Sequence, residues 1–191
     1  LEFRRVLFRS LHLVAMGRTI GRATVARIEI HDDDRRDPPM DTIEHVIRSQ
    51  GWRFNRVEDD EMAAEVQGRW CDYNLHFAYA EEVEAIHLTC AFDLRIPARK
   101  RQLVYELLAL INDRMWLGHF SLWNVEGLPI YRHAIPLRGA EGLAPEQVED
   151  LLDVAIAECE RFYPAFQYLI WGGKSPDEAF SAAIIDPIGE A

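Results

Sequence analysis

The clearest pattern in the chain is a change of hydrophobic period near residue 97. From Ile86 to Ile96, apolar side chains occupy the even-numbered positions and alternate with polar or small ones. This alternation predicts a strand with one buried face. From Leu103 to Met115, apolar side chains recur at spacings of three and four, which predicts an amphipathic helix that begins at Pro97. We expect the apolar stripe of this helix to lie against the even-numbered row of the strand.

The segments around this unit predict an α+β fold with the order α-β-β-β-β-α-β-β-α-α. A short helix precedes three strands at 52–57, 62–66 and 73–79, and two strands follow the central helix at 119–125 and 128–137. Short connections between strands are typical of antiparallel hairpins. The chain ends in two helices, so we expect an antiparallel sheet with flanking helices.

Three prolines predict local irregularities. Pro129 and Pro136 fall within the strand at 128–137 and favour an edge position, because proline cannot donate to a strand ladder. Pro164 falls within the first of the two final helices, which we expect it to interrupt.

The beginning of the chain differs from the rest. Residues 1–10 resemble the translation of a sequencing-library adapter, and we interpret them as an assembly artefact. Residues 11–38 have no sustained hydrophobic period and are expected to form a loosely ordered leader. Residues 39–191 have the length of one domain, and no apolar run approaches the ~20 residues of a membrane span.

Net charge narrows the range of partners. The chain has 21 basic and 32 acidic residues, a net charge of −11. Residues 1–10 hold three arginines and one glutamate, and residues 11–38 are balanced, so residues 39–191 carry −13. Phosphate backbones and anionic membranes repel such a domain, and we expect it to bind neither nucleic acid nor membrane. The three cysteines are widely spaced, which fits buried thiols in a reducing cytoplasm.

The motifs that could carry catalysis are incomplete. Gly173-Lys174-Ser175 ends like a phosphate-binding loop, but Tyr168 stands where that loop needs glycine. We interpret the sequence as a helix end followed by a capping box. Three histidines, His87, His119 and His133, could bind a metal if their strands are neighbours, but histidines on the wet face of a sheet are more often surface residues. We predict no catalytic residue, metal or cofactor.

Two features suggest a contact surface instead. Arg99, Lys100 and Arg101 form a tight basic cluster in the first turn of the central helix, where cations oppose the helix dipole. They could pair with Glu81, Glu82 or Asp93, or with an acidic partner. Large aromatic side chains also exceed what one face of each element can bury, which favours a partner or dimer surface. The aromatic candidates are Trp116, Phe120, Trp123, Phe166 and Trp171.

Four segments carry a resemblance to a known family. Tyr105–Asn112, Trp116–Phe120, Glu158–Pro164 and Leu169–Pro176 resemble the YbjN-domain proteins of bacteria, which are described as sensory-transduction regulators. The similarity extends over about residues 35–191. It implies a fold like that of class I type III secretion chaperones, often dimeric, and supplies no catalytic residues.

We therefore expect a non-catalytic cytoplasmic domain that binds protein, as a homodimer, in regulation or chaperoning. The alternative is a small-ligand sensor or an enzyme with a pocket beside Trp116, His119, His133 and Trp171.

Overall fold

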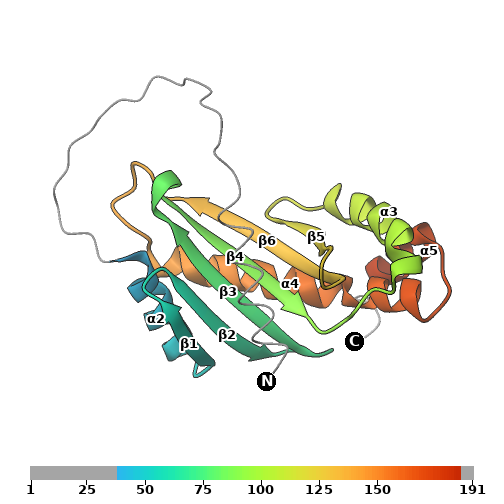
Figure 1. Ribbon diagram of the computed structural model, residues 1–191, viewed down its shortest axis with the longest axis horizontal. Helices are drawn as coiled ribbons and strands as arrows, with labels where there is room; N and C mark the ends of the chain where they lie inside the picture. Colours follow the sequence, from blue (N-terminus) through green and yellow to red (C-terminus); the bar gives the residue numbers. More distant parts are fainter. Residues whose placement is uncertain (1–37, 186–191) are drawn as a thin grey trace, which may run out of the picture. The chain divides into compact units, whose positions relative to one another are not determined.

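The computed structural model describes residues 38–185, which form a six-stranded antiparallel sheet and four α-helices (Figure 1). The helices are α2 (Pro39–Ser49), α3 (Arg101–Asn112), α4 (Pro145–Ile170) and α5 (Pro176–Ile185). The strands are β1 (Arg53–Glu58), β2 (Glu61–Gln67), β3 (Asp72–Ala80), β4 (Ala85–Phe92), β5 (His119–Trp123) and β6 (Leu128–Pro136), with 3₁₀ turns η1 (Glu81–Val83) and η2 (Ala98–Lys100). The predicted α+β class and element order are confirmed. The predicted adapter product and leader lie outside the described residues, apart from Pro38.

The sheet has the strand order β1-β2-β3-β4-β6-β5, and every neighbouring pair is antiparallel. The first four strands form the expected meander. Strand β6 returns beside β4, and β5 lies outside it at the edge of the sheet. The prediction that residues 128–137 form an edge strand is therefore wrong.

The two prolines of β6 lie where neither neighbouring strand needs their N–H. The N–H of Leu137 donates to a carbonyl on the β4 side at 2.7 Å, and successive N–H groups of a strand point to alternate sides. An N–H at position 129 would therefore point toward β4, whose ladder with β6 ends at Ile130. An N–H at position 136 would point toward β5, whose ladder with β6 ends at Arg132. Pro129 and Pro136 thus remove no ladder hydrogen bond from an internal strand.

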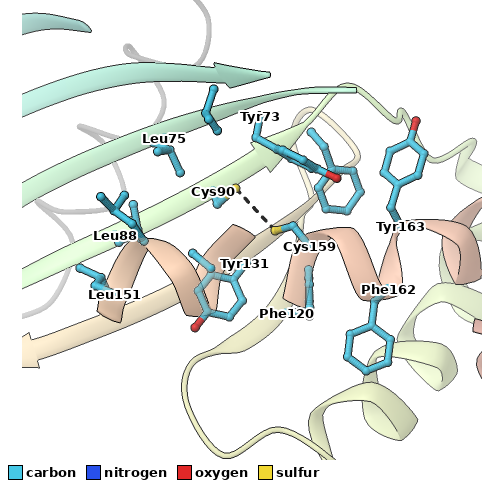
Figure 2. Packing of buried hydrophobic residues seen from close by; sticks show 14 of the residues in the cluster. Tyr73, Leu75, Leu88, Cys90, Phe120, Tyr131, Leu151, Cys159, Phe162 and Tyr163 are labelled. Carbon is cyan, nitrogen blue, oxygen red and sulfur yellow. Dashed lines mark hydrogen bonds between the residues drawn. The ribbon is translucent and has the colours of Figure 1, made fainter. Parts of the chain in front are cut away.

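Helix α4 covers the even-numbered row of β4. The Sγ atoms of Cys90 on β4 and Cys159 on α4 lie 3.5 Å apart inside the core (Figure 2). The expectation that α3 would cover this row is wrong. Helix α3 packs mainly on α5 and β5, with a smaller contact to α4. Helix α4 has eleven buried side chains, whereas α3 has four. Placing α4 on the sheet therefore buries the larger apolar area.

Helix α4 continues through Pro164, contrary to the expected interruption. A helical proline leaves the carbonyl four residues earlier without its donor, here that of Glu160. The indole N–H of Trp70, in the loop between β2 and β3, donates to this carbonyl at 3.0 Å. Pro164 is itself buried. A bond from outside the helix therefore replaces the one that proline removes.

Helix α3 protects the edge of the sheet at β5. The side-chain amide of Asn112 donates to the carbonyl of Phe120 at 3.0 Å and accepts from its N–H at 2.8 Å. These bonds satisfy both backbone groups of one residue on the outer side of an edge strand. Since unpaired edges invite pairing with other chains, Asn112 blocks addition of a strand at this point.

Candidate functional site

Trp116 is the most exposed large apolar residue in the described part of the chain, with 99% of its surface accessible. It lies in the turn between α3 and β5, beside Leu117, which is 51% exposed. The turn is fixed to β6, because the hydroxyl of Tyr131 donates to the carbonyl of Leu117 at 3.2 Å. Gly118 has a left-handed φ of +66°, and a Cβ at this position would overlap the ring of Tyr131. The fixed turn therefore presents an indole to the surroundings.

Trp171 lies at the C-terminal end of α4 and is 67% exposed. The helix ends through a left-handed Gly173 and a hydrogen bond from the N–H of Lys174 to the carbonyl of Tyr168 at 3.3 Å. Ser175 and Glu178 then exchange hydrogen bonds as a capping box at the start of α5. This segment is a helix end and a cap, as predicted, and it follows a helix where a phosphate-binding loop needs a strand.

Three of the predicted surface aromatics lie inside the protein. Phe120 is 2% exposed, Phe166 is 0% exposed, and their ring centroids are 5.9 Å apart. Trp123 is 7% exposed, at the end of β5 on the sheet face opposite α4. Their assignment to an accessible surface is therefore wrong. The all-round hydrophobicity of their segments reflects burial on two sides, whereas Trp116 and Trp171 remain on the surface.

The predicted basic cluster spans η2 and the first residue of α3. Arg99 is exposed, and Lys100 and Arg101 are half-buried. The structure shows no ion pair between these residues and Glu81, Glu82 or Asp93 within residues 38–185. One terminal nitrogen of Arg101 lies beside Gly127, 3.3 Å from the position that a Cβ on this glycine would occupy. The cluster therefore presents uncompensated positive charge on a domain that is otherwise acidic.

The sheet face opposite α4 carries a row of polar side chains that the sequence did not reveal. His76 on β3 pairs with Thr89 on β4, Thr89 with Arg132 on β6, and Arg132 with His119 on β5. Residues directly opposite on antiparallel strands lie on one face, with Cβ atoms about 4.5–5.5 Å apart. We call His76, Thr89, Arg132 and His119 the polar row. Period-two alternation separated the two faces of β4, but the expectation that the odd-numbered face is wet is wrong at Thr89, which is 1% exposed. Only the register aligns these four residues.

The three histidines that the sequence suggested as metal ligands lie on different faces of the sheet. His87 lies on the face of the polar row, where its Nε2 accepts from Nε of Arg132 at 3.2 Å. His133 pairs with Leu88 and lies on the α4 face, where Nδ1 is 3.3 Å from the hydroxyl of Tyr131. His119 and His133 therefore lie on opposite faces, and the predicted pocket of Trp116, His119, His133 and Trp171 does not form around both imidazoles.

Burial controls the electrostatics of this region. Burial, and then the charge of Arg132, lowers the pKa of His87 to about 4. The same two causes lower the pKa of His119. Burial also lowers the pKa of Arg132, although a guanidinium stays charged at all physiological pH values. At neutral pH this part of the sheet face therefore combines the fixed positive charge of Arg132 with neutral imidazoles of His87 and His119, which can donate or accept hydrogen bonds.

Within residues 38–185, the structure offers little support for a metal site, a small-molecule pocket or a membrane-spanning helix. No three His, Cys, Asp or Glu side chains within 38–185 are placed to hold a metal ion. A small hollow of about 140 Å³ between the end of α2 and α4 is lined by Trp52, Glu149 and Asp153, with Gln50 and Leu152. This volume is below the roughly 300 Å³ typical of small-molecule pockets. Among the helices of residues 38–185, none has the length and apolar character needed to cross a membrane.

Comparison with known protein families agrees with the resemblance seen in the sequence. The YbjN family model, described as "Putative bacterial sensory transduction regulator", matches residues 39–168. The solved structure "Crystal structure of YbjN, a putative transcription regulator from E. coli" is similar at a TM-score of 0.47 and 12% identity, over 64% of this chain and 87% of that chain. No curated protein matches the chain. Since the family model covers more than half of the sequence, this chain belongs to the YbjN family.

Proposed function

We propose that this chain is a non-catalytic, cytoplasmic regulatory or chaperone-like domain that binds protein and forms a homodimer. The observation that carries the proposal is the exposure of Trp116 on a turn that Gly118 and Tyr131 hold in place. Tryptophan is enriched among the residues that dominate protein interfaces, because its large apolar surface is desolvated on binding. A nearly fully accessible tryptophan on a fixed turn gains that free energy only when another surface covers it.

Charge supports a protein partner over nucleic acid or membrane. Residues 39–191 carry a net charge of −13, which opposes association with phosphate-rich surfaces. The exposed guanidinium of Arg99 and the half-buried Lys100 form a local exception near the start of α3. An acidic protein segment would complement that cluster. The family description as a sensory transduction regulator fits a role in binding, and the free thiols of Cys71, Cys90 and Cys159 fit a reducing compartment.

Affinity capture from a lysate of the encoding bacterium tests the proposal. The bait is the full chain, and the variants are Trp116→Ser and Trp171→Ser. Val125→Ser is the matched control, because Val125 is 77% exposed in the turn between β5 and β6. We expect the wild type and Val125→Ser to retain the same protein at equal yield, and both tryptophan variants to lose most of it. Equal recovery with all four baits would contradict the proposal.

A further inference from the structure

A buried hydroxyl and a guanidinium without a carboxylate lie side by side in the polar row. Thr89 on β4 is directly opposite Arg132 on β6, and Arg132 is directly opposite His119 on β5. His87 lies two residues before Thr89 on the same face and accepts a hydrogen bond from Arg132 at 3.2 Å. Side chains from three adjacent strands therefore surround one position on the sheet.

Two of these side chains keep polar groups that no protein partner in the described residues uses. Thr89 is 1% exposed, and its Oγ1 has no hydrogen-bond partner. Buried polar atoms are usually paired, so a persistent exception calls for a cause such as a missing ligand. Arg132 is half-buried and forms no ion pair with a carboxylate in the described part of the chain. This is unusual in a sequence with 32 acidic residues, where carboxylates are abundant.

The donors around this position suit a tetrahedral oxyanion. Only Nε of Arg132 is used on His87, so the two terminal nitrogens remain to form a planar fork toward a ligand. The hydroxyl of Thr89 and the imidazole of His119 add donors from the two flanking strands. Phosphate has enough oxygens to accept from all three directions, whereas the two oxygens of a carboxylate lie in one plane with their carbon.

Burial and charge also indicate how the ligand enters. Exposure increases along the row, from buried Thr89 through half-buried Arg132 to exposed His119, so the position opens toward β5. Glu61, a carboxylate on this face, is held by His76 at 3.5 Å, two strands and about 10 Å from His87. A partly buried position on an acidic domain admits a soluble molecule more readily than an anionic membrane surface.

We propose that Thr89, Arg132, His87 and His119 form a binding site for a small, soluble phosphate-bearing molecule. The site lies on the sheet face opposite α4 and does not depend on the protein-binding role proposed above.

Titration with inorganic phosphate tests this site in the full chain. The readouts are calorimetric binding and the side-chain NMR signals of His87 and His119, compared with sodium chloride at equal ionic strength and with acetate. We expect phosphate to bind and to shift both imidazole signals, while chloride and acetate shift neither. Thr89→Val keeps the shape of the side chain and removes only its hydroxyl, so the variant should fold and lose at least tenfold in phosphate affinity. Arg132→Gln should abolish detectable binding.

Arg138→Gln provides the charge control, because Arg138 is exposed in the loop after β6. It removes one positive charge elsewhere and should leave phosphate affinity unchanged. Equal phosphate affinity in the wild type, Thr89→Val and Arg132→Gln would overturn the proposal. An equal response to chloride or acetate would do the same, as would flotation with phosphatidic acid vesicles without binding of soluble phosphate.

Discussion

The indole N–H of Trp70 donates to the backbone carbonyl of Glu160, 3.0 Å away, the carbonyl that Pro164 leaves without a donor inside α4. The N–H of Arg69 also donates to the carboxylate of Glu160 at 2.6 Å. The ring of Trp70 stacks on that of Tyr163 with a centroid distance of 6.3 Å. The loop between β2 and β3 is therefore fixed to the helix at the point where proline weakens it.

This relationship predicts a coupling between Trp70 and Pro164. Trp70→Phe keeps an aromatic ring but removes the donor, and should lower the free energy of unfolding by about 1 kcal/mol. In a Pro164→Ala background, the alanine N–H can bond to the carbonyl of Glu160, so the same change should have a smaller effect. Urea unfolding of the four proteins of this double-mutant cycle measures the coupling. Equal effects of Trp70→Phe in both backgrounds would refute it, and Trp171→Phe serves as a control.

Two glycines with similar backbone angles should respond differently to alanine. Gly118 and Gly139 have φ of +66° and +79°, so both substitutions strain the backbone. At Gly139 the new methyl meets no atom within 4 Å, and the loss should be about 1 kcal/mol. At Gly118 it overlaps the ring of Tyr131, and we expect a loss of about 2–5 kcal/mol. Thermal unfolding of the two variants checks this order, and similar melting temperatures would be inconsistent with the described turn.

Asn112 should control both stability and self-association at the β5 edge. Asn112→Ala removes two hydrogen bonds to the backbone of Phe120 and should lower the free energy of unfolding by about 1–3 kcal/mol. Because the edge is then unprotected, the variant should also aggregate faster on warming, as measured by light scattering. Asn124→Ala removes an exposed hydrogen bond from the hydroxyl of Tyr105 in the next turn but leaves the β5 edge covered, so it should not speed aggregation. Unchanged aggregation in Asn112→Ala would mean that α3 protects the edge by other contacts.

The lowered pKa of His87 predicts loss of stability in acid. Its pKa is about 4 in the folded protein and about 6.5 when unfolded, so the unfolded chain takes up the proton first as pH falls. The contribution of His87 is complete above pH 6.5 and is lost between pH 6.5 and 4. Thermal unfolding from pH 7.5 to 4.5 should show a smaller decline for His87→Gln than for the wild type. Parallel declines would contradict this role, and His45→Gln, at an exposed position on α2, is the control.

Local patterns predicted most of the elements in this fold. The even-numbered row from Ile86 and the stripe from Leu103 each gave the right element type, and the order of all ten elements was correct. The partner of each face was harder to predict, because both α3 and α4 carry apolar stripes. Only the assembled core shows that Cys159 on α4 lies beside Cys90.

The strand order, the exposed aromatic residues and the polar row could not be predicted from local sequence patterns. Pro129 and Pro136 suggested an edge strand, but their effect on the sheet depends on which side each missing N–H faces. The aromatic residues could not be sorted by pattern, because Phe120 and Trp116 occupy segments of similar hydrophobicity and differ only in tertiary burial. Thr89 and Arg132 are 43 positions apart in the sequence, and the strand register alone places them together.

The central claim is that the exposed surface around Trp116 is covered by protein in the native assembly, and sedimentation velocity of the purified full chain tests it most directly. We predict that the wild type and Val125→Ser sediment with twice the mass of one chain, and that Trp116→Ser shifts toward the mass of a single chain while its unfolding temperature stays the same. A wild type that sediments as a single chain, or a Trp116→Ser variant that stays dimeric, would contradict the account.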